Sequence, residues 1–138
     1  MTSQEDFAGL LAAQNEIIDH WKMARGSRDL PGRANIDPGV LRAHLGSISI
    51  LEIDGEGAVR FRLIGTRLRD ILGSDMRGLC LDEANETAIE IWRTGLQRAL
   101  ENKRPVFGIE ERGKTHHGWL RLPLAPRADG GALVLCHD

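Results

Sequence analysis

The chain has 138 residues, the length of a single domain, and 41% of them are hydrophobic, as in ordinary globular proteins. Its 18 Lys and Arg against 20 Asp and Glu give a net charge of −2. The chain contains no run of five like charges, so we expect no nucleic-acid-binding surface of the usual kind. No apolar stretch approaches the roughly 18 residues of a membrane span. Cys80 and Cys136 lie far apart without a CxxC motif, so we expect reduced thiols and a cytoplasmic location.

The first part of the chain predicts two helices separated by a loop. Apolar residues recur at three- and four-residue steps over residues 5–25, the pattern of an amphipathic helix. Residues 26–36 have the composition of a loop. Asp37 and Pro38 then favour the start of a short helix, which we expect to end at Gly46.

The rest of the chain predicts five strands and one long helix. Thr66 is positioned to cap a short helix over residues 67–72, and Gly73 ends it. A longer helix is expected over residues 83–103, and Pro105 prevents it from continuing further. The expected strands are residues 48–53, 58–64, 106–111, 118–124 and 132–137.

This order of elements predicts the fold class. Because the five strands share a single long crossover, we expect an α+β fold with a five-stranded antiparallel sheet and helices on one face. The amphipathic segment and its loop, residues 1–36, form an N-terminal flanking helix and linker, and residues 37–138 form the main domain.

The order is similar to that of the PAS fold, and two stretches of sequence sharpen this resemblance. Residues 61–78 resemble the PAS segment in which a strand leads into a short helix, a Gly, an acidic turn and a second Gly. Residues 21–25, 30–33 and 36–38 (WKMAR, LPGR and IDP) resemble a family of small single-domain PAS proteins of alphaproteobacteria. The resemblance covers roughly residues 15–137, nearly the whole chain.

The resemblance implies a non-enzymatic sensory or regulatory module in bacterial signal transduction that binds a small molecule, a partner protein or both. PAS domains bind such partners between the sheet and the long helix, and many dimerise through an N-terminal helix. Because no effector region follows residue 138, the resemblance implies a separate signalling protein as partner, and a homodimer formed partly by residues 5–25.

An apolar ligand pocket is the first candidate site. Side chains expected between the sheet and the long helix could enclose a small apolar molecule, or they could simply fill a close-packed core. The candidates are Phe61, Leu63, Leu68, Leu72, Met76, Trp92, Leu96 and Leu122.

A partner or dimer surface is the second candidate. The apolar stripe of the first helix could meet another chain or pack on its own sheet, and two arginines could dock a partner or be solvated and paired. The candidates are Phe7, Leu10, Leu11, Ile18, Trp21, Arg60 and Arg62.

We expect no catalytic residue, metal site, haem or flavin. Side chains of Cys136, His137 and Asp138 alternate across a strand and cannot converge as a triad. Residues 83–103 contain no His to ligate haem, and the stretch around Cys80 lacks the Asn, Arg and Phe of photoactive flavin domains.

The alternative is a small α+β enzyme of the cone-shaped or hot-dog type that acts on a small hydrophobic substrate. Such an enzyme needs a polar pair facing its cavity. Glu111 with His116 or His117 is the available pair, and a salt bridge across a hairpin explains it equally well.

Overall fold

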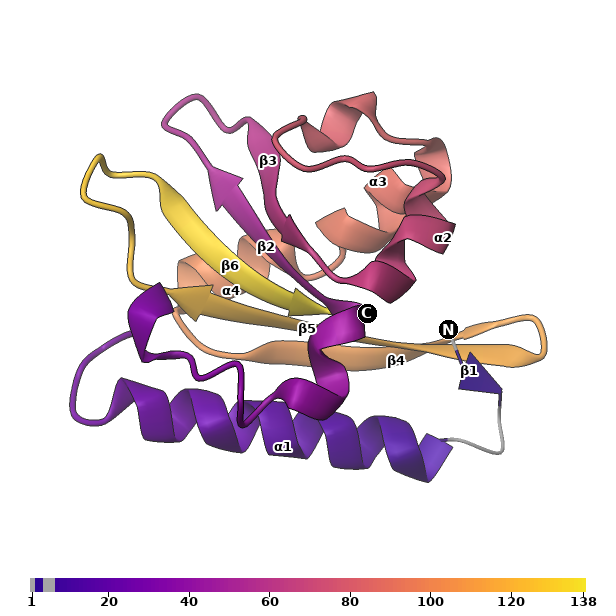
Figure 1. The fold of residues 1–138 in the computed structure, drawn as a ribbon, viewed down its shortest axis with the longest axis horizontal. Helices are drawn as coiled ribbons and strands as arrows, with labels where there is room; N and C mark the ends of the chain where they lie inside the picture. The colour runs from indigo at the N-terminus through magenta and orange to yellow at the C-terminus, as the bar shows by residue number, and fades with distance from the viewer. Residues whose placement is uncertain (1, 4–6) are drawn as a thin grey trace.

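A single antiparallel sheet forms the centre of the molecule. The computed structural model describes residues 2–3 and 7–138 (Figure 1). The strand order is β1-β5-β6-β2-β3, and β4 pairs with β5 along its other edge, which confirms the expected five-stranded sheet and adds the two-residue β1. The strands are β1 (Thr2–Ser3), β2 (Ile48–Ile53), β3 (Val59–Ile64), β4 (Val106–Arg112), β5 (Thr115–Leu124) and β6 (Ala132–His137).

Helices cover both faces of this sheet. The N-terminal helix lies along one face, and the helices between β3 and β4 lie on the other (Figure 1). Residues 5 and 6, expected in the first helix, lie outside the described residues. No helix in the described part of the chain has the length and apolarity to cross a bilayer. The α-helices are α1 (Phe7–Arg25), α2 (Arg69–Leu72), α3 (Glu86–Arg93) and α4 (Leu96–Asn102), and the 3-10 helices are η2 (Arg33–Asn35), η3 (Arg42–Ser47), η4 (Thr66–Leu68) and η5 (Leu81–Glu83).

Strand β6 separates two hydrophobic clusters. Leu133 and Leu135 point towards α1, whereas Val134 and Cys136 point towards α3. Because side chains alternate along a strand, a strand with helices on both faces is buried along nearly its whole length. Both β5 and β6 are accordingly buried from their second residue to their last.

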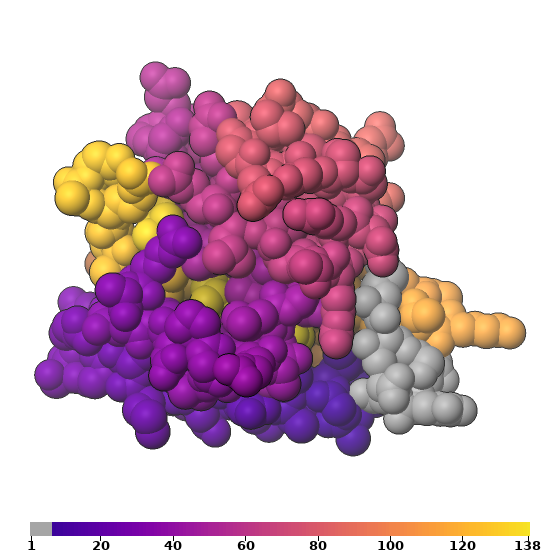
Figure 2. All heavy atoms as spheres, viewed as in Figure 1, coloured from indigo at the N-terminus to yellow at the C-terminus, as the bar shows by residue number. Residues whose placement is uncertain are grey.

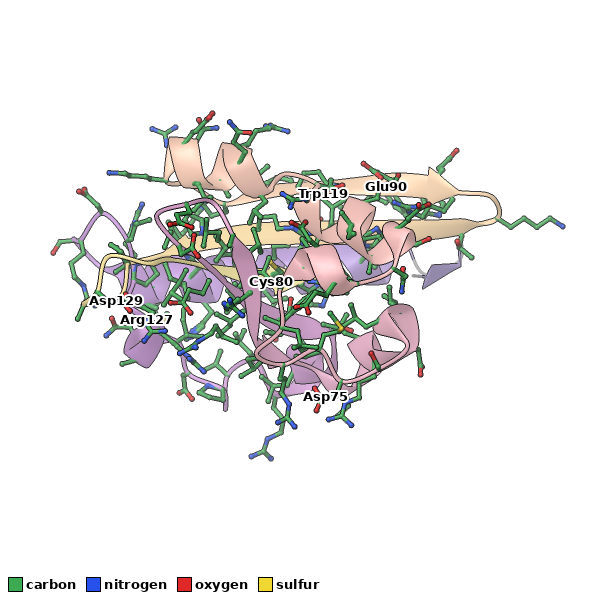
Figure 3. The ribbon with its side chains drawn as sticks, turned by 90° about the horizontal axis from the view of Figure 1, so that it is seen from above. Asp75, Cys80, Glu90, Trp119, Arg127 and Asp129 are labelled. Carbon is green, nitrogen blue, oxygen red and sulfur yellow. The ribbon has the colours of Figure 1, made fainter. Side chains whose placement is uncertain are left out.

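The prediction of a single long helix over residues 83–103 is wrong. The structure has two helices, α3 and α4, separated at Thr94 and Gly95. Gly95 has a φ of +73°, which does not continue a right-handed helix, and a Cβ at this position would overlap the ring of Trp119. The side chain of Trp119 lies between the β4–β5 strands and these two helices (Figure 3). The helix is therefore interrupted at Gly95, the residue that the Trp119 ring contacts.

The short helices also differ from expectation. Residues 38–41 form a turn, and the helix that follows is the 3-10 helix η3, which includes Gly46. Thr66 is the first residue of η4 and does not cap it through its side chain. The N-cap residue is instead Gly65, at which a Cβ would overlap the carbonyl oxygens of Leu45 and Gly46.

The hairpin from β4 to β5 is longer than the sequence predicted. Its turn at Gly113 and Lys114 is confirmed, but β5 begins at Thr115 rather than at residue 118. His116 and His117 therefore lie inside the strand, and they point to opposite faces of the sheet.

We predict that Gly95→Ala destabilises the protein by about 3 kcal/mol, because it combines left-handed backbone strain with overlap against the Trp119 ring. Gly113→Ala is the matched control, since Gly113 has a φ of +65° but open space around it, and it should cost about 1 kcal/mol. Urea unfolding measures both. Equal losses for the two variants would show that Trp119 does not restrict this position.

Candidate functional site

The residues expected to line one apolar pocket lie on two faces of the sheet. Leu63 and Leu122 belong to the cluster beneath α1. The other six candidates pack together beneath α2 and α3, and all are buried; they are Phe61, Leu68, Leu72, Met76, Trp92 and Leu96. The structure therefore brings six of the eight residues together and separates two.

A β-bulge explains why Leu63 leaves the group. Ile50 pairs with Leu63 and Leu51 pairs with Phe61, so β3 carries Arg62 as one extra residue at this point. A bulge shifts the alternation of side chains along its strand. Phe61 therefore faces α3 while Leu63 faces α1, although a regular period of two places them on the same side.

Trp92 fills the centre of the six-residue group. Its indole Nε1 donates a hydrogen bond to Ser49 Oγ at 3.0 Å, and its ring meets that of Phe61 edge to face at 5.5 Å between centroids. The polar tip of the indole is thus satisfied while its body packs among apolar side chains. This group has the features of a filled hydrophobic core.

The expected partner surface is likewise divided. Trp21 and Ile18 are buried against the chain's own sheet, and Trp21 Nε1 donates to the carbonyl oxygen of Pro123 at 2.8 Å. Phe7 and Leu11 remain exposed, and Leu10 is half-buried. The apolar stripe of α1 therefore packs mainly on its own sheet, and the large apolar side chains of the helix that stay exposed are Phe7 and Leu11 near its start and Met23 near its end.

The two candidate arginines of β3 both contact polar groups of their own chain. Arg60 donates from Nη1 to the carbonyl oxygen of Gly78 at 3.0 Å. Arg62 Nε lies 3.2 Å from Glu52 Oε2. Both side chains are on the surface, where such pairs contribute at most about 1 kcal/mol.

A buried ion pair that the sequence analysis missed joins β5 to the end of β6. Arg121 is 0% exposed, and its Nη1 and Nη2 lie 3.0 and 3.1 Å from the two carboxylate oxygens of Asp138. Arg121 also donates to the carbonyl oxygens of Ile91 at 2.7 Å and Thr94 at 3.0 Å, where α3 ends. His117 Nε2 lies 3.0 Å from Asp138 Oδ1.

Opposite charges dominate the ionisation of this group. Burial by itself raises the pKa of Asp138. Arg121 and His117 lower this pKa by more than burial raises it, so the net pKa is below its usual range. Burial lowers the pKa of Arg121, and Asp138 reverses this, so the net pKa is raised. Both side chains are therefore charged at neutral pH. An Arg in the middle of an apolar strand, between Leu120 and Leu122, is the sequence signal that could have revealed them.

The last strand shows the expected divergence of Cys136 and His137. Cys136 packs on the α3 side, where burial raises the pKa of its thiol from 9.0 to about 12. A thiol with this pKa is protonated at neutral pH and is a poor nucleophile. His137 lines the cavity described below and faces the opposite side of the sheet, so the two side chains diverge.

A cavity of about 480 Å³ lies beside His137, where β6 ends. In Figure 2, yellow atoms of β6 are visible between the purple segment, which includes η3, and the magenta segment, which includes β3. Leu10 and Ala13 of α1 and Leu68 and Ile71 on the opposite wall supply its apolar surface. The polar residues in its lining are His44, Ser47, Arg67, Asp70, His137 and Asp138, and the Asp138 side chain itself is buried in its pair with Arg121.

Two imidazoles stand at the edge of this cavity. The rings of His44 and His137 meet edge to face, 5.8 Å apart, and His44 Nε2 lies 2.9 Å from Glu16 Oε2. Burial is the main cause that lowers the pKa of His137 from 6.5 to about 4. His137 is therefore neutral at pH 7, and within the described residues its Nδ1 has no hydrogen-bond partner.

The remaining chemistry-bearing residues do not assemble into a centre. His116 Nε2 lies 3.7 Å from Glu111 Oε1 across the hairpin, and Glu111 is exposed, as in a surface salt bridge. Cys80 is half-buried and unpaired. Among residues 2–3 and 7–138, no group of three His, Cys, Asp or Glu side chains is placed to hold a metal ion.

A comparison with protein families matches most of the chain. A family model described as "PAS domain" matches residues 11–130. The chain is similar in structure to the PAS domain of histidine kinase ThkA, with 20% identity, a TM-score of 0.47, and coverage of 67% of this chain and 97% of that one. A selenomethionine variant of the same domain matches with 19% identity, the same TM-score and the same coverage. No curated protein matches the chain.

We predict that Arg121→Met destabilises the protein by about 3–5 kcal/mol, because it leaves the carboxylate of Asp138 buried without a counter-ion. Arg93→Met is the control, since Arg93 forms an exposed pair with Asp82 at 2.7 Å and should contribute below about 1 kcal/mol. Urea unfolding compares them. If both variants lose the same free energy of unfolding, the buried pair contributes no more to stability than the exposed one. The double variant Arg121→Met/Asp138→Leu should recover part of the loss.

We predict that the protein loses stability as the pH falls from about 6.5 to about 4. In this range unfolded His137 takes up a proton that the folded protein rejects, because its folded pKa is lowered to about 4. The loss from this residue is at most about 3 kcal/mol. Unfolding free energies at a series of pH values measure it, and His137→Gln should flatten the curve. Parallel curves for the two proteins would contradict the assignment.

Proposed function

Since the chain belongs to the PAS domain family, we propose that it is a non-enzymatic sensory module that binds a small molecule and signals to a partner protein. PAS domains are typically sensory modules of signal transduction. The finer parts of this proposal, which are the ligand, its site and the partner, rest on the geometry of the chain itself.

The cavity beside His137 is the observation that supports ligand binding. Its volume of about 480 Å³ lies within the range of about 300–1,000 Å³ that is usual for small-molecule pockets. Apolar residues of α1, η4 and α2 and polar residues of η3, η4, α2 and β6 meet in it. This combination suits a small molecule with both an apolar body and a hydrogen-bonding group.

The core beneath α3 is the less suitable site. Trp92 and Phe61 occupy its centre in contact, and the Trp92 Nε1 proton is already bound by Ser49. A ligand in this place would have to displace close-packed side chains, which costs several kcal/mol. We therefore propose the cavity and not this core as the ligand site.

The cavity also adjoins the elements that could pass on a signal. Asp138, in its lining, binds Arg121, which in turn binds the carbonyl oxygens at the end of α3. Leu10 and Ala13 belong to α1. A ligand that touches these groups would bias the positions of α1 and of the break between α3 and α4.

A homodimer and a cytoplasmic location remain predictions. Of the expected dimer surface, Phe7 and Leu11 at the start of α1 are the exposed apolar members. Light scattering of the full chain at rising concentration measures dimer formation. The unpaired thiols of Cys80 and Cys136 fit a reducing compartment.

We predict that Ala13→Leu removes ligand binding, because the larger side chain fills the cavity. Native mass spectrometry of the protein purified from its own cells should detect a retained small molecule, with occupancy lowered about tenfold in this variant. Ala12→Leu is the matched control, since Ala12 is the exposed neighbour and does not line the cavity.

The same comparison can refute the proposal. The cavity is not the ligand site if a retained molecule stays at full occupancy in Ala13→Leu. Absence of any retained molecule, together with no thermal shift across a metabolite panel, would argue against ligand sensing altogether. Circular dichroism on each variant confirms that it is folded.

A further inference from the structure

A second hollow lies on the surface between α1 and the loop that follows it. This groove has a volume of about 470 Å³ and runs between the C-terminal half of α1 and residues 35–40. Both walls lie on the face drawn in Figure 2, where the indigo and purple segments meet. The groove is distinct from the cavity beside His137, because the two share no lining residue.

The groove exposes apolar side chains that the fold leaves uncovered. Met23 is 81% exposed and Val40 is 51% exposed, and both line it together with Ala24. Neighbouring apolar side chains on the surface of a soluble domain are typical of interaction sites. Met is suited to this role because its flexible thioether adapts to the shape of a partner.

The rim of the groove is acidic. Glu16, Asp19 and Asp37 line it, and no Lys or Arg does. In the described part of the chain, neither Asp19 nor Asp37 forms an ion pair. Arg25, near the end of α1, stacks over Trp21 on a different side of the helix. The groove therefore presents negative charge around an apolar centre.

Hydrogen bonds hold the two walls in place. The backbone N–H of Asp37 donates to His20 Nε2 at 2.9 Å, which ties the loop to α1. The Asp37 carboxylate accepts the N–H of Gly39 at 2.8 Å and so fixes the turn that carries Val40. A preformed groove loses less entropy when a partner binds than a mobile surface does.

We propose that this groove binds an amphipathic helix of a partner protein whose apolar ridge is flanked by Lys or Arg. The apolar ridge packs on Met23 and Val40, and the flanking cations lie near Asp19 and Asp37. Burial of the ridge supplies affinity, while the charges supply orientation and faster association. The proposal rests on the proposed signalling function for its biological meaning, because it identifies the chemistry of the partner.

One side-chain contact connects the groove with the cavity. Glu16 lines the groove, His44 lines the cavity, and their side chains lie 2.9 Å apart. A ligand that binds His44 would compete with Glu16 for this imidazole. The pair thus offers a direct route from an occupied cavity to the charge of the groove.

A pair of synthetic peptides tests the docking site on the full chain without any added ligand. The first is an amphipathic helix of about four turns with Leu along one face and Lys on both flanks, and the second has Glu in place of Lys. We expect the Lys peptide to bind and the Glu peptide to bind at least about tenfold more weakly, by fluorescence anisotropy. High salt should weaken the Lys peptide. Backbone amide shifts on binding should map to residues 16–24 and 35–40.

Three variants separate this groove from general attraction to an acidic protein. Met23→Ser and Asp19→Lys should each weaken the Lys peptide about tenfold. Glu56→Lys makes the same charge change in the exposed turn between β2 and β3 and should alter binding less than about twofold. Equal effects of Asp19→Lys and Glu56→Lys, or amide shifts elsewhere on the chain, would overturn the proposal.

Sedimentation velocity provides the remaining outcome. If the wild-type chain is a dimer and Met23→Ser is a monomer, a second copy covers the groove and the partner proposal is wrong. These measurements are independent of the cavity, because no small molecule is present. Failure of the groove therefore leaves the result for Ala13→Leu unaffected, and the reverse also holds.

Discussion

The buried guanidinium of Arg121 determines where several distant parts of the chain must lie. A cation in the interior requires a counter-ion and acceptors for its N–H groups, because an unpaired buried charge costs several kcal/mol. Asp138 supplies the counter-ion, and the carbonyl oxygens of Ile91 and Thr94 accept hydrogen bonds from the remaining N–H groups. Strand β5, the end of β6 and the end of α3 are thereby held together. The same contacts place a cation at the C-terminus of α3, where the helix dipole favours positive charge.

The end of β6 brings this ion pair next to the cavity beside His137. Asp138 belongs to the buried pair, and the preceding residue, His137, faces the cavity on the other side of the sheet. Across the cavity, His44 binds Glu16, which lines the acidic groove. In the proposed function, a small molecule in the cavity is therefore one side chain away from the core ion pair and one side chain away from the partner surface. This proximity supports a sensor in which binding at one place alters contact at another.

Much of the architecture could be predicted because it depends on local chemistry. The strand at residues 48–53 and the turn at Gly113 and Lys114 follow from periodicity and turn residues, and both were located correctly. The break at Gly95 was missed because it depends on the Trp119 ring, which lies far along the chain. The sequence did not indicate the cavity beside His137. The cavity is formed by α1, η3, η4, α2 and β6, and no periodic pattern in one segment indicates where these five elements meet.

The sequence by itself determined the fold class, the number of main strands and the resemblance to PAS domains, because these depend on hydrophobic periodicity and short motifs. Only the tertiary structure decided which face each strand residue occupies. The bulge at Arg62 turns Leu63 away from Phe61, and long-range pairing selects that register. It also decided that Arg121 is buried, since a charge can enter the core only where Asp138 and the carbonyl oxygens of α3 converge on it. Such convergence arises from residues distant in the chain, and no local pattern records it.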